Sequence, residues 1–451
     1  MPLRMLTSLP PLKPVPLKPS RSTIKTASLS TNRMKEYKYL IIGGGVAGTT
    51  AAGTIRQQDT TGSIAIISDE PHYLYSRIML SKPNFFLGKI PFDQIWLRDK
   101  NWYRDKNIDF IGGRTATRLD HAAKTIYLDD NSSLKYEKLL LATGMSPRGL
   151  PVPGTEKHGV HYLRTLDQGK GIIESVSTAK QAVAIGGGFI SFEMANIMRM
   201  SGAEVTIIIR ENLFWEPILD PTASQIVEQA MTSAGVKIVR HAQIKQITGN
   251  VNVTGITLQN GTVIPCDTVI CGIGAYCNVD WVQNSGIKTD CGILADQHLQ
   301  TNLPNVWTAG DVSQFSDPIL KEEVQLGNWV NAQEQGRIAG LNMLGNKTPF
   351  TFVSFYTSHG FDTSITFIGN VSPQKASVTI TRHGPSDNQH AQIIAVNDQV
   401  VGAVLINQTS ILQALSKIIA SNLNIADKKP QLEDPKFDLN QLINSPPHDK
   451  A

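Results

Sequence analysis

IIGGGVAGTTAAG at residues 41–53 is the first of two glycine-rich stretches that decide the fold of this chain, and AIGGGFISFEMA at residues 184–195 is the second. Each stretch follows a short apolar strand and opens a helical run. Glycine lets the backbone approach a pyrophosphate closely, and the N–H groups at the start of the helix favour its negative charge. One such stretch is weak evidence, because glycines also serve ordinary turns. Two of them predict a protein that holds two dinucleotides and passes electrons from one to the other.

The apolar runs around both stretches predict βαβ units. They are KYLII (38–42) and SIAIIS (63–68) for the first, and QAVAI (181–185) and EVTIII (204–209) for the second. Asp69 and Glu70 close the strand at 63–68, about 20 residues beyond the glycines, where a carboxylate can accept ribose hydroxyls. Of the two acids we favour Glu70.

The rest of the chain changes character in steps. LLLATG (139–144) predicts a strand that leads into a Pro- and Gly-rich crossing between domains, and residues 236–264 are β-rich. Residues 305–315 predict a strand with Asp311 near its end, and residues 328–345 have helical periodicity. The final hundred or so residues hold short strands, one helix and a polar tail, which we interpret as a separate α+β domain.

Charge and hydropathy exclude several classes of protein. The chain of 451 residues has 42 Lys and Arg against 38 Asp and Glu, but residues 1–35 carry seven of the bases and no acid. The remainder is therefore near neutral, at −3, which argues against a nucleic-acid surface driven by bulk charge. No stretch approaches the roughly 20 apolar residues of a membrane span, so we do not expect a membrane-spanning protein.

The N-terminal segment, residues 1–35, leaves two interpretations open. It is basic, free of acids and rich in Ser, Thr and Pro, which is typical of an organelle transit peptide. Its prolines, among them Pro10, Pro11, Pro14, Pro16 and Pro19, would break the amphipathic helix that a mitochondrial leader forms. A disordered extension is therefore the alternative, and Met34 could itself be a start. The sequence is therefore compatible with a mitochondrial or a cytoplasmic protein.

The four cysteines predict neither a metal site nor a dithiol relay. Their spacing contains no C-x-x-C and no common zinc pattern. They are Cys266, Cys271, Cys277 and Cys291, and three of them lie in or near one apolar run. We expect them to act as small buried hydrophobes.

Several blocks, taken in order, resemble the FAD-dependent pyridine nucleotide-disulfide oxidoreductase superfamily. The blocks are GGGVAG (43–48), YSRIMLSK (75–82), LLLATGMSPRGLPVPG (139–154), YLRTLDQG (162–169), GGGFISFE (186–193), VWTAGDV (306–312) and NWVNAQEQGRIAGLNMLG (328–345). Within that superfamily they are similar to the branch of ferredoxin reductases, rubredoxin reductases and apoptosis-inducing-factor-like proteins. The C-terminal domain matches that branch in length and place only.

The resemblance implies an α/β fold in which a nicotinamide domain is inserted into an FAD domain. It predicts a disordered or transit segment at 1–35 and two parts of the FAD domain at 36–150 and 278–345. The NAD(P)-binding domain is expected at 151–277, and a C-terminal α+β domain at 346–451 would pack against the flavin side or a partner subunit.

The resemblance also implies which residues hold FAD. Gly43, Gly45 and Gly48 would form the pyrophosphate loop, Glu70 would accept the adenosine ribose, and Ala142, Thr143 and Gly144 would close over the cofactor. Arg77 can pair with phosphate, and Lys82 would lie near the flavin edge. Asp311 would hold the ribityl or pyrophosphate side, and Trp329 falls where an aromatic residue lies near the isoalloxazine ring.

The second nucleotide is expected at Gly186, Gly188 and Ser191, where serine replaces the third glycine of the motif but stays small enough for close packing. Gly274 is placed with the cofactor-binding residues. Glu193 would lie near the nicotinamide and form an ion pair with Lys82, which would keep a cation where negative charge develops on reduction. These two residues are the predicted catalytic pair.

The choice of nicotinamide nucleotide is left open by the sequence. An acid at the end of the EVTIII strand would favour NADH, but Ile209 occupies that place and Arg210 follows it, which suits a 2′-phosphate. No second basic residue follows in ENLFWEP, and Glu211 could reach the ribose. The balance tilts slightly to NADPH.

The sequence therefore predicts an NAD(P)H-oxidising flavoprotein that gives its electrons to an acceptor outside the chain. Residues 71–90 contain no cysteine, which argues against a disulfide reductase with its redox cysteine there. The acceptor could be a small iron–sulfur or rubredoxin-type protein, a quinone, a monodehydroascorbate-like radical or oxygen. The alternative is a redox-sensing flavoprotein with slow turnover and NAD(P)H-dependent dimerisation, so a homodimer is also left open.

Overall fold

The computed structural model describes residues 35–372 and 378–444. The predicted transit or disordered segment lies outside these residues, except that Lys35 is the first residue of strand β1 (Lys35–Ile42). Within these two ranges no helix has both the length and the apolar character needed to cross a membrane.

The first sheet is built around a parallel core. Its parallel strands stand in the order β3-β2-β1-β6-β18, and β4 and β5 extend it as an antiparallel meander along the first half of β6. The strands after β1 are β2 (Ile64–Ser68), β3 (Ile108–Gly112), β4 (Ala116–Asp120), β5 (Thr125–Leu128), β6 (Ser133–Leu141) and β18 (Val306–Thr308). The apolar runs at 38–42, 63–68 and 139–141 thus become neighbouring buried strands, as their composition predicts.

The second sheet repeats this plan. Its five strands are parallel in the order β11-β10-β9-β15-β8, and a separate antiparallel meander accompanies them. The parallel strands are β8 (Val160–His161), β9 (Gln181–Ile185), β10 (Glu204–Ile208), β11 (Lys237–Val239) and β15 (Thr268–Cys271). The meander is β12 (Ile244–Thr248), β13 (Gly255–Leu258) and β14 (Val263–Pro265), with the predicted Asn260-Gly261 turn between the last two.

The second sheet is inserted into the first unit. The chain leaves through β7 (Ser146–Pro147) and returns through β16 (Ala275–Tyr276), and these two strands pair with each other. It then forms β17 (Ile293–Ala295) and re-enters the first sheet through β18, followed by β19 (Ser313–Asp317) and β20 (Glu322–Val324). The predicted α/β architecture, with one dinucleotide domain inserted into the other, is confirmed.

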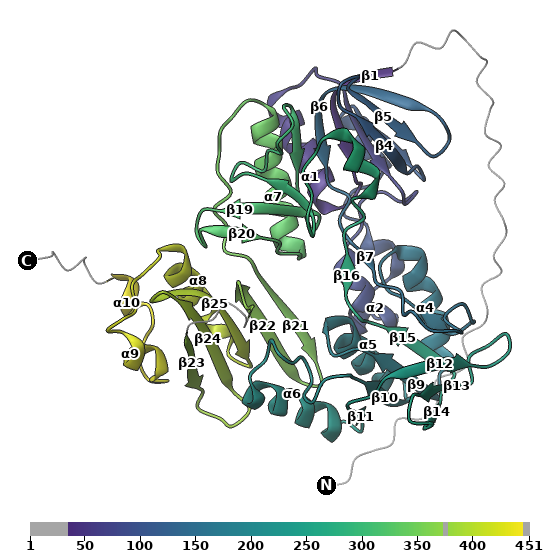
Figure 1. Cartoon of the computed structure of the whole chain (residues 1–451), viewed down its shortest axis with the longest axis vertical. Helices are drawn as coiled ribbons and strands as arrows, with labels where there is room; N and C mark the ends of the chain where they lie inside the picture. Colours follow the sequence, from purple (N-terminus) through teal and green to yellow (C-terminus); the bar gives the residue numbers. More distant parts are fainter. Residues whose placement is uncertain (1–34, 373–377, 445–451) are drawn as a thin grey trace, which may run out of the picture. The chain divides into compact units, whose positions relative to one another are not determined.

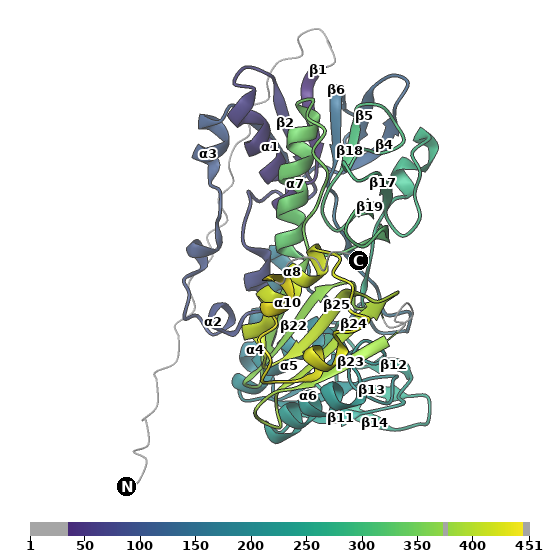
Figure 2. The same ribbon diagram turned by 90° about the vertical axis from the view of Figure 1, so that its left-hand side faces the viewer.

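Helices connect the strands of both units. They are α1 (Val46–Gln58), α2 (Pro83–Phe86), α3 (Lys100–Asp105), α4 (Leu166–Thr178), α5 (Phe189–Met200), α6 (Pro221–Ser233) and α7 (Trp329–Met343), with short 3₁₀ turns at Arg77–Ser81, Phe92–Ile95 and Asp280–Ser285. Helices α1 and α7 lie side by side in Figures 1 and 2. A Cβ on Gly336 would stand 2.2 Å from the carbonyl oxygen of Ala47, so a glycine at this crossing lets the two helices approach closely.

The C-terminal unit is an antiparallel sheet covered by helices (Figure 2). Its order is β21-β22-β25-β24-β23, formed by β21 (Phe355–Gly360), β22 (Thr363–Gly369), β23 (Val378–His383), β24 (His390–Val396) and β25 (Gln399–Ile406). A 3₁₀ turn at Thr409–Ile411 leads into α8 (Leu412–Ala420), and α9 (Lys429–Glu433) and α10 (Gln441–Asn444) follow. Leu415, Ile418 and Ile419 of α8 are buried in one apolar core with residues of the sheet. The predicted α+β character is confirmed.

Candidate active site

A cavity of about 620 Å³ opens beyond the carboxyl ends of strands β1, β2 and β6. This is the edge of a parallel sheet where ligands bind in doubly wound folds. Eleven of the predicted site residues line it, namely Gly43, Gly45, Glu70, Arg77, Lys82, Ala142, Thr143, Gly144, Glu193, Asp311 and Trp329. Further parts of the wall come from the loop after β2, the residues before α4, the start of α5, the start of α7 and strand β21. Sequence analysis named no residue of β21, although it expected the C-terminal domain to pack against the flavin side or a partner subunit.

The first glycine loop and the helix that follows it leave no room for a Cβ at Gly43 and at Gly48. Gly43 has a φ of +122°, and a Cβ there would lie 2.0 Å from the carbonyl oxygen of Ala142. A Cβ on Gly48 would lie 2.0 Å from the carbonyl oxygen of Gly43, so Gly48 packs the helix onto the loop and does not line the cavity. Gly45 is different, because nothing lies within 4 Å of a Cβ placed there. The absence of that Cβ leaves room in the cavity for a ligand.

Two long helices begin at this cavity. Gly45 is the N-cap of α1, and Asn328 is the N-cap of α7, with its side-chain oxygen accepting from the N–H of Asn331 at 2.9 Å. Both N-caps line the cavity, as does Trp329, the first residue of α7. Helix N-termini carry positive partial charge, so this geometry suits the pyrophosphate of a dinucleotide.

The second glycine loop repeats the geometry of the first. Gly186 has a φ of +108°, and a Cβ there would lie 2.4 Å from the carbonyl oxygen of Gly272, which follows β15. The third position is Ser191, which is fully buried and donates its hydroxyl to the carbonyl of Ile185 at 3.0 Å. Serine therefore fits where the motif has its third glycine. Gly186, Gly188 and Ser191 do not line the cavity described above, and their role toward a nucleotide stays a prediction.

The predicted Lys82–Glu193 ion pair is present. The Nζ of Lys82 lies 2.5 Å from Glu193 Oε1, and the same oxygen accepts the hydroxyl of Ser358 at 2.7 Å. The hydroxyl of Ser81 donates to the other carboxylate oxygen. The Glu193 side chain is 8% exposed and that of Lys82 is 28% exposed. The buried carboxylate of Glu193 on α5 therefore has donors from the segment that contains Ser81 and Lys82 and from strand β21 of the C-terminal unit.

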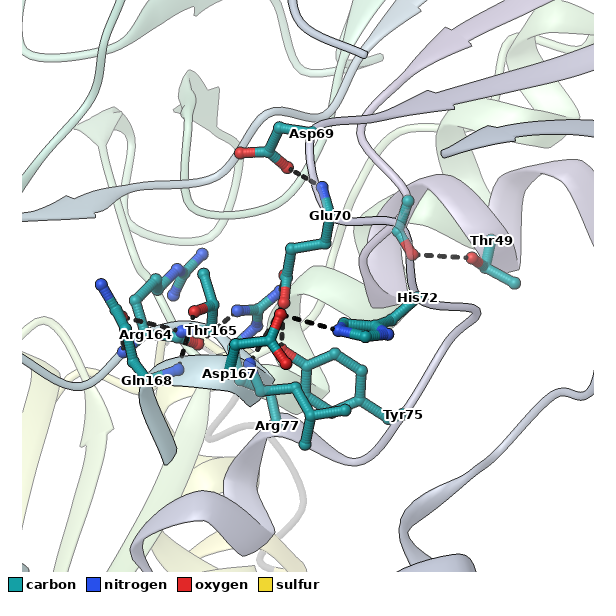
Figure 3. A network of polar contacts seen from close by, with 12 residues as sticks. Thr49, Asp69, Glu70, His72, Tyr75, Arg77, Arg164, Thr165, Asp167 and Gln168 are labelled. Carbon is teal, nitrogen blue, oxygen red and sulfur yellow. Dashed lines mark hydrogen bonds and ion pairs between the residues drawn. The ribbon is translucent and has the colours of Figure 1, made fainter. Parts of the chain in front are cut away.

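The carboxylate of Glu70 is already engaged within the protein. It accepts the guanidinium of Arg77 at 2.6 Å, the hydroxyl of Tyr75 at 2.8 Å and the N–H of Leu166 at 3.2 Å. Asp69 lies apart from this cluster in Figure 3, and its carboxylate accepts the N–H of Glu70 at 2.9 Å. Three of the roughly four acceptor positions of the Glu70 carboxylate are therefore filled from within the protein. The preference for Glu70 over Asp69 as the ribose acceptor stays a prediction.

Arg164 is a cavity residue that sequence analysis missed. Its Nη2 lies 3.5 Å from a carboxylate oxygen of Asp311 and within 2.7 Å of where a Cβ on Gly144 would stand. Burial, together with the charge of Arg77, lowers the pKa of Arg164. The YLRTLDQG block contains this arginine, so its signal was in the sequence without a role attached to it. Ser81 belonged to the YSRIMLSK block without a role attached to it, and Ser358 was missed, because a lone serine carries no motif.

Arg210 and Gly274 also lie outside the cavity, as Gly48, Gly186, Gly188 and Ser191 do. Arg210 follows β10 with its side chain 81% exposed, 3.6 Å from the carboxylate of Glu211. Gly274 lies at the crossing between the two units, where its carbonyl accepts the N–H of Arg148 at 2.9 Å. The structure thus gives Gly274 a backbone role at the crossing, and any contact of either residue with a nucleotide stays a prediction.

Three of the four cysteines are buried as the sequence predicts, and Cys291 is not. Cys266, Cys271 and Cys277 are buried and all four are free, with Cys291 exposed. Burial raises the pKa of Cys266 to about 12 and that of Cys271 to about 11, so neither thiol is a ready nucleophile. The described residues that line the cavity include no cysteine. Among the residues that the structure describes, no cluster of ligands could hold a metal ion.

The cavity fits a flavin dinucleotide. Two helix N-termini, the open space at Gly45 and the nearby guanidinium groups of Arg77 and Arg164 provide for a pyrophosphate. The wall also carries apolar and aromatic side chains for a ring system, among them Trp329 and Tyr356. The fold and this site define a class of protein, the two-dinucleotide flavin oxidoreductases.

The family follows from comparison with known proteins. Residues 37–336 match the family described as pyridine nucleotide-disulphide oxidoreductase, and the chain belongs to that family. Its cofactors are FAD and NAD(P)H, and it is an NAD(P)H-dependent FAD oxidoreductase of the ferredoxin-reductase branch, as the sequence blocks implied.

Named relatives support this assignment. The chain is 29% identical over 406 residues to rhodocoxin reductase of Rhodococcus erythropolis, covering 90% of this chain and 94% of that protein. It is 30% identical over 375 residues to the NADH-dependent phenylglyoxylate dehydrogenase subunit epsilon of Aromatoleum evansii, covering 82% and 88%. The covalent putidaredoxin reductase–putidaredoxin complex matches with a TM-score of 0.84 and 26% identity, over 91% of this chain and 99% of that chain. A ferredoxin reductase from Rhodopseudomonas palustris gives a TM-score of 0.82 and 27% identity, covering 90% and 99%.

Proposed function

We propose that this oxidoreductase passes electrons from NAD(P)H to a small iron–sulfur or rubredoxin-type protein that docks from outside. The observation that carries the proposal is the cavity itself, whose described lining contains a buried ion pair but no cysteine that could take the electrons onward. The names of the relatives support the acceptor class, because rhodocoxin reductase and putidaredoxin reductase serve small redox proteins.

Each part of the site has a distinct task. Bound FAD supplies the hydride acceptor and the route for single electrons to leave. Lys82 would keep positive charge beside the ring, where negative charge develops. Glu193 holds the Lys82 ammonium in place, and Ser81 and Ser358 hold Glu193. Asp311 and Arg164, whose charged groups lie 3.5 Å apart, would hold the part of the cofactor between ring and pyrophosphate.

The function is tested by following the flavin absorbance of the purified protein under anaerobic conditions. We expect NADH or NADPH to bleach the flavin stoichiometrically, and an added ferredoxin- or rubredoxin-type protein to restore the oxidised spectrum within seconds. A quinone should restore it at least tenfold more slowly at equal concentration. A long-lived charge-transfer band that resists both acceptors, with a shift to dimer on size exclusion, would instead support the redox-sensing alternative.

Arg210 is proposed to favour NADPH through the 2′-phosphate. Ile209, at the end of the strand, is buried and lies against the second glycine loop, so it offers no carboxylate to a ribose hydroxyl. An ion pair between an exposed arginine and a phosphate contributes about 1.4 kcal/mol, which is tenfold in affinity. The variant Arg210→Ala should therefore lower the ratio of kcat/KM for NADPH to that for NADH about tenfold.

The control for Arg210 is Lys237→Ala, which removes an exposed positive charge from the start of the neighbouring parallel strand β11, away from the carboxyl end of β10 that Arg210 follows. In Lys237→Ala the ratio of kcat/KM for NADPH to that for NADH should stay within about twofold of its value in the unmodified protein. Equal loss of kcat/KM with both nucleotides in Arg210→Ala would contradict a role in reading the 2′ position.

A further inference from the structure

Glu70 joins two segments that lie far apart in the sequence. Its carboxylate accepts the N–H of Leu166, and Arg77, which it also binds, donates to the carbonyl oxygen of Arg164. A further contact follows the same path, since Nε2 of His72 lies at hydrogen-bonding distance, 3.0 Å, from a carboxylate oxygen of Asp167. Figure 3 shows these contacts crossing from the loop after β2 to the start of α4. The loop belongs to the first dinucleotide unit and α4 to the inserted one.

Glu70 also balances charge at the cavity. Arg77 and Arg164 both line the cavity, and two neighbouring guanidinium groups repel each other. The Glu70 side chain is 12% exposed, so its ion pair with Arg77 is shielded from solvent. The ring of Tyr75 lies 5.2 Å from the Arg77 guanidinium and its hydroxyl donates to Glu70, which restricts both partners. Arg77 is thereby held in one orientation by three groups.

This arrangement separates Glu70 from its neighbour Asp69. Glu70 accepts three hydrogen bonds from the protein, which leaves about one of the four acceptor positions of a carboxylate, whereas Asp69 is exposed at the cavity wall. A carboxylate that must accept ribose hydroxyls needs free oxygens, and one that orients an arginine needs bonds of the kind that Glu70 makes.

We propose that Glu70 is a positioning residue, which fixes Arg77 for the anionic part of FAD and ties cofactor binding to the joint between the two dinucleotide units. Asp69 then takes the direct contact with the adenosine ribose. The proposal rests on FAD as the cofactor of this cavity and is independent of which acceptor receives the electrons.

The test is a double-mutant cycle measured as the FAD dissociation constant of the cofactor-free protein. Glu70→Gln should raise this constant about tenfold in the unmodified protein and less than twofold in the Arg77→Gln background, because a residue that acts through Arg77 loses its effect when Arg77 is gone. The matched control Asp69→Asn should weaken FAD binding by the same factor in both backgrounds. An equal effect of Glu70→Gln in both backgrounds would overturn the proposal.

Two further measurements separate positioning from a loss of fold. The variant Glu70→Asp keeps the charge and should bind FAD within about threefold of the unmodified protein. In the cofactor-free protein, Glu70→Ala should speed hydrogen exchange at the Leu166 amide, while Asp69→Ala should not. If the exchange rate at the Leu166 amide did not change in Glu70→Ala, the proposed link between the two dinucleotide units through Glu70 would be wrong. The rate of flavin reduction in the unmodified protein, measured at saturating FAD, reports on the proposed function separately.

Discussion

Replacing Lys82 by methionine is expected to slow reduction of the bound flavin by NAD(P)H about 100-fold, the loss typical of removing one preorganised charge from an active site. The rate is measured by stopped-flow absorbance under anaerobic conditions with saturating nucleotide. Methionine keeps the length and the apolar stem of lysine, so the change removes the ammonium with little loss of packing.

Two effects of this change act in the same direction. Lys82 lies 2.5 Å from Glu193, so without it the carboxylate keeps only the hydroxyls of Ser81 and Ser358 as donors from the described contacts. An uncompensated negative charge would then stand where the reduced flavin becomes negative. The cation that offsets that charge would be gone as well. The second substitution Glu193→Gln in the Lys82→Met background should recover part of the rate by removing the unpaired charge.

The matched control for this prediction is Lys89→Met, an exposed lysine in the same segment. The flavin bound to Lys89→Met should be reduced by NAD(P)H at the rate of the unmodified protein. The ratio of flavin to protein absorbance should also be unchanged. If Lys82→Met retained FAD and was also reduced at the unmodified rate, the ion pair would be a structural contact without a role in hydride transfer.

The sequence was sufficient for those parts of the fold that depend on local pattern. Strand β9 matches its predicted run QAVAI, and β1, β2 and β10 begin or end within three residues of theirs. The conformation of Gly43 and Gly186 follows from the same local requirement, because a turn with positive φ needs glycine wherever it occurs.

Contacts between segments that are distant in the sequence could not be predicted from local sequence pattern. Glu70 was predicted as a ribose acceptor from its place after a strand, but its donors include Leu166, which is 96 residues away. Ser358 reaches Glu193 from strand β21, whose sequence FYTSHG mixes polar and aromatic residues without a clear alternation. The Lys82–Glu193 pair was predictable because family blocks carry both residues, although neither residue shows by itself that they meet.

Alanine at Gly43 and alanine at Gly45 are expected to fail in different ways, although the two residues share one loop. Gly43→Ala forces a side chain into a φ of +122° and places its Cβ 2.0 Å from the carbonyl oxygen of Ala142. Strain and clash together should cost about 3 kcal/mol or more of folding free energy, even without cofactor. Gly45→Ala meets neither obstacle, since its φ is −72° and nothing lies within 4 Å of the added carbon.

The two losses are separated by measuring thermal unfolding of the cofactor-free proteins and their FAD dissociation constants. The free energy of unfolding of Gly45→Ala should lie within about 1 kcal/mol of that of the unmodified protein, which is the effect of alanine at an N-cap. Its FAD dissociation constant should rise at least tenfold, because the added methyl group enters the space beside the α1 N-terminus. Gly43→Ala should lose folding stability first and cofactor as a consequence.

Gly202 provides the control for backbone strain alone. It has a φ of +93° in the turn before β10, and no atom lies within 4 Å of a Cβ placed there. Gly202→Ala should therefore lower the free energy of unfolding by about 1 kcal/mol, because alanine disfavours a left-handed backbone conformation. It should leave the FAD dissociation constant unchanged. If Gly45→Ala bound FAD as tightly as Gly202→Ala, the pyrophosphate could not lie against this loop, and the cavity would have to hold its ligand by another wall.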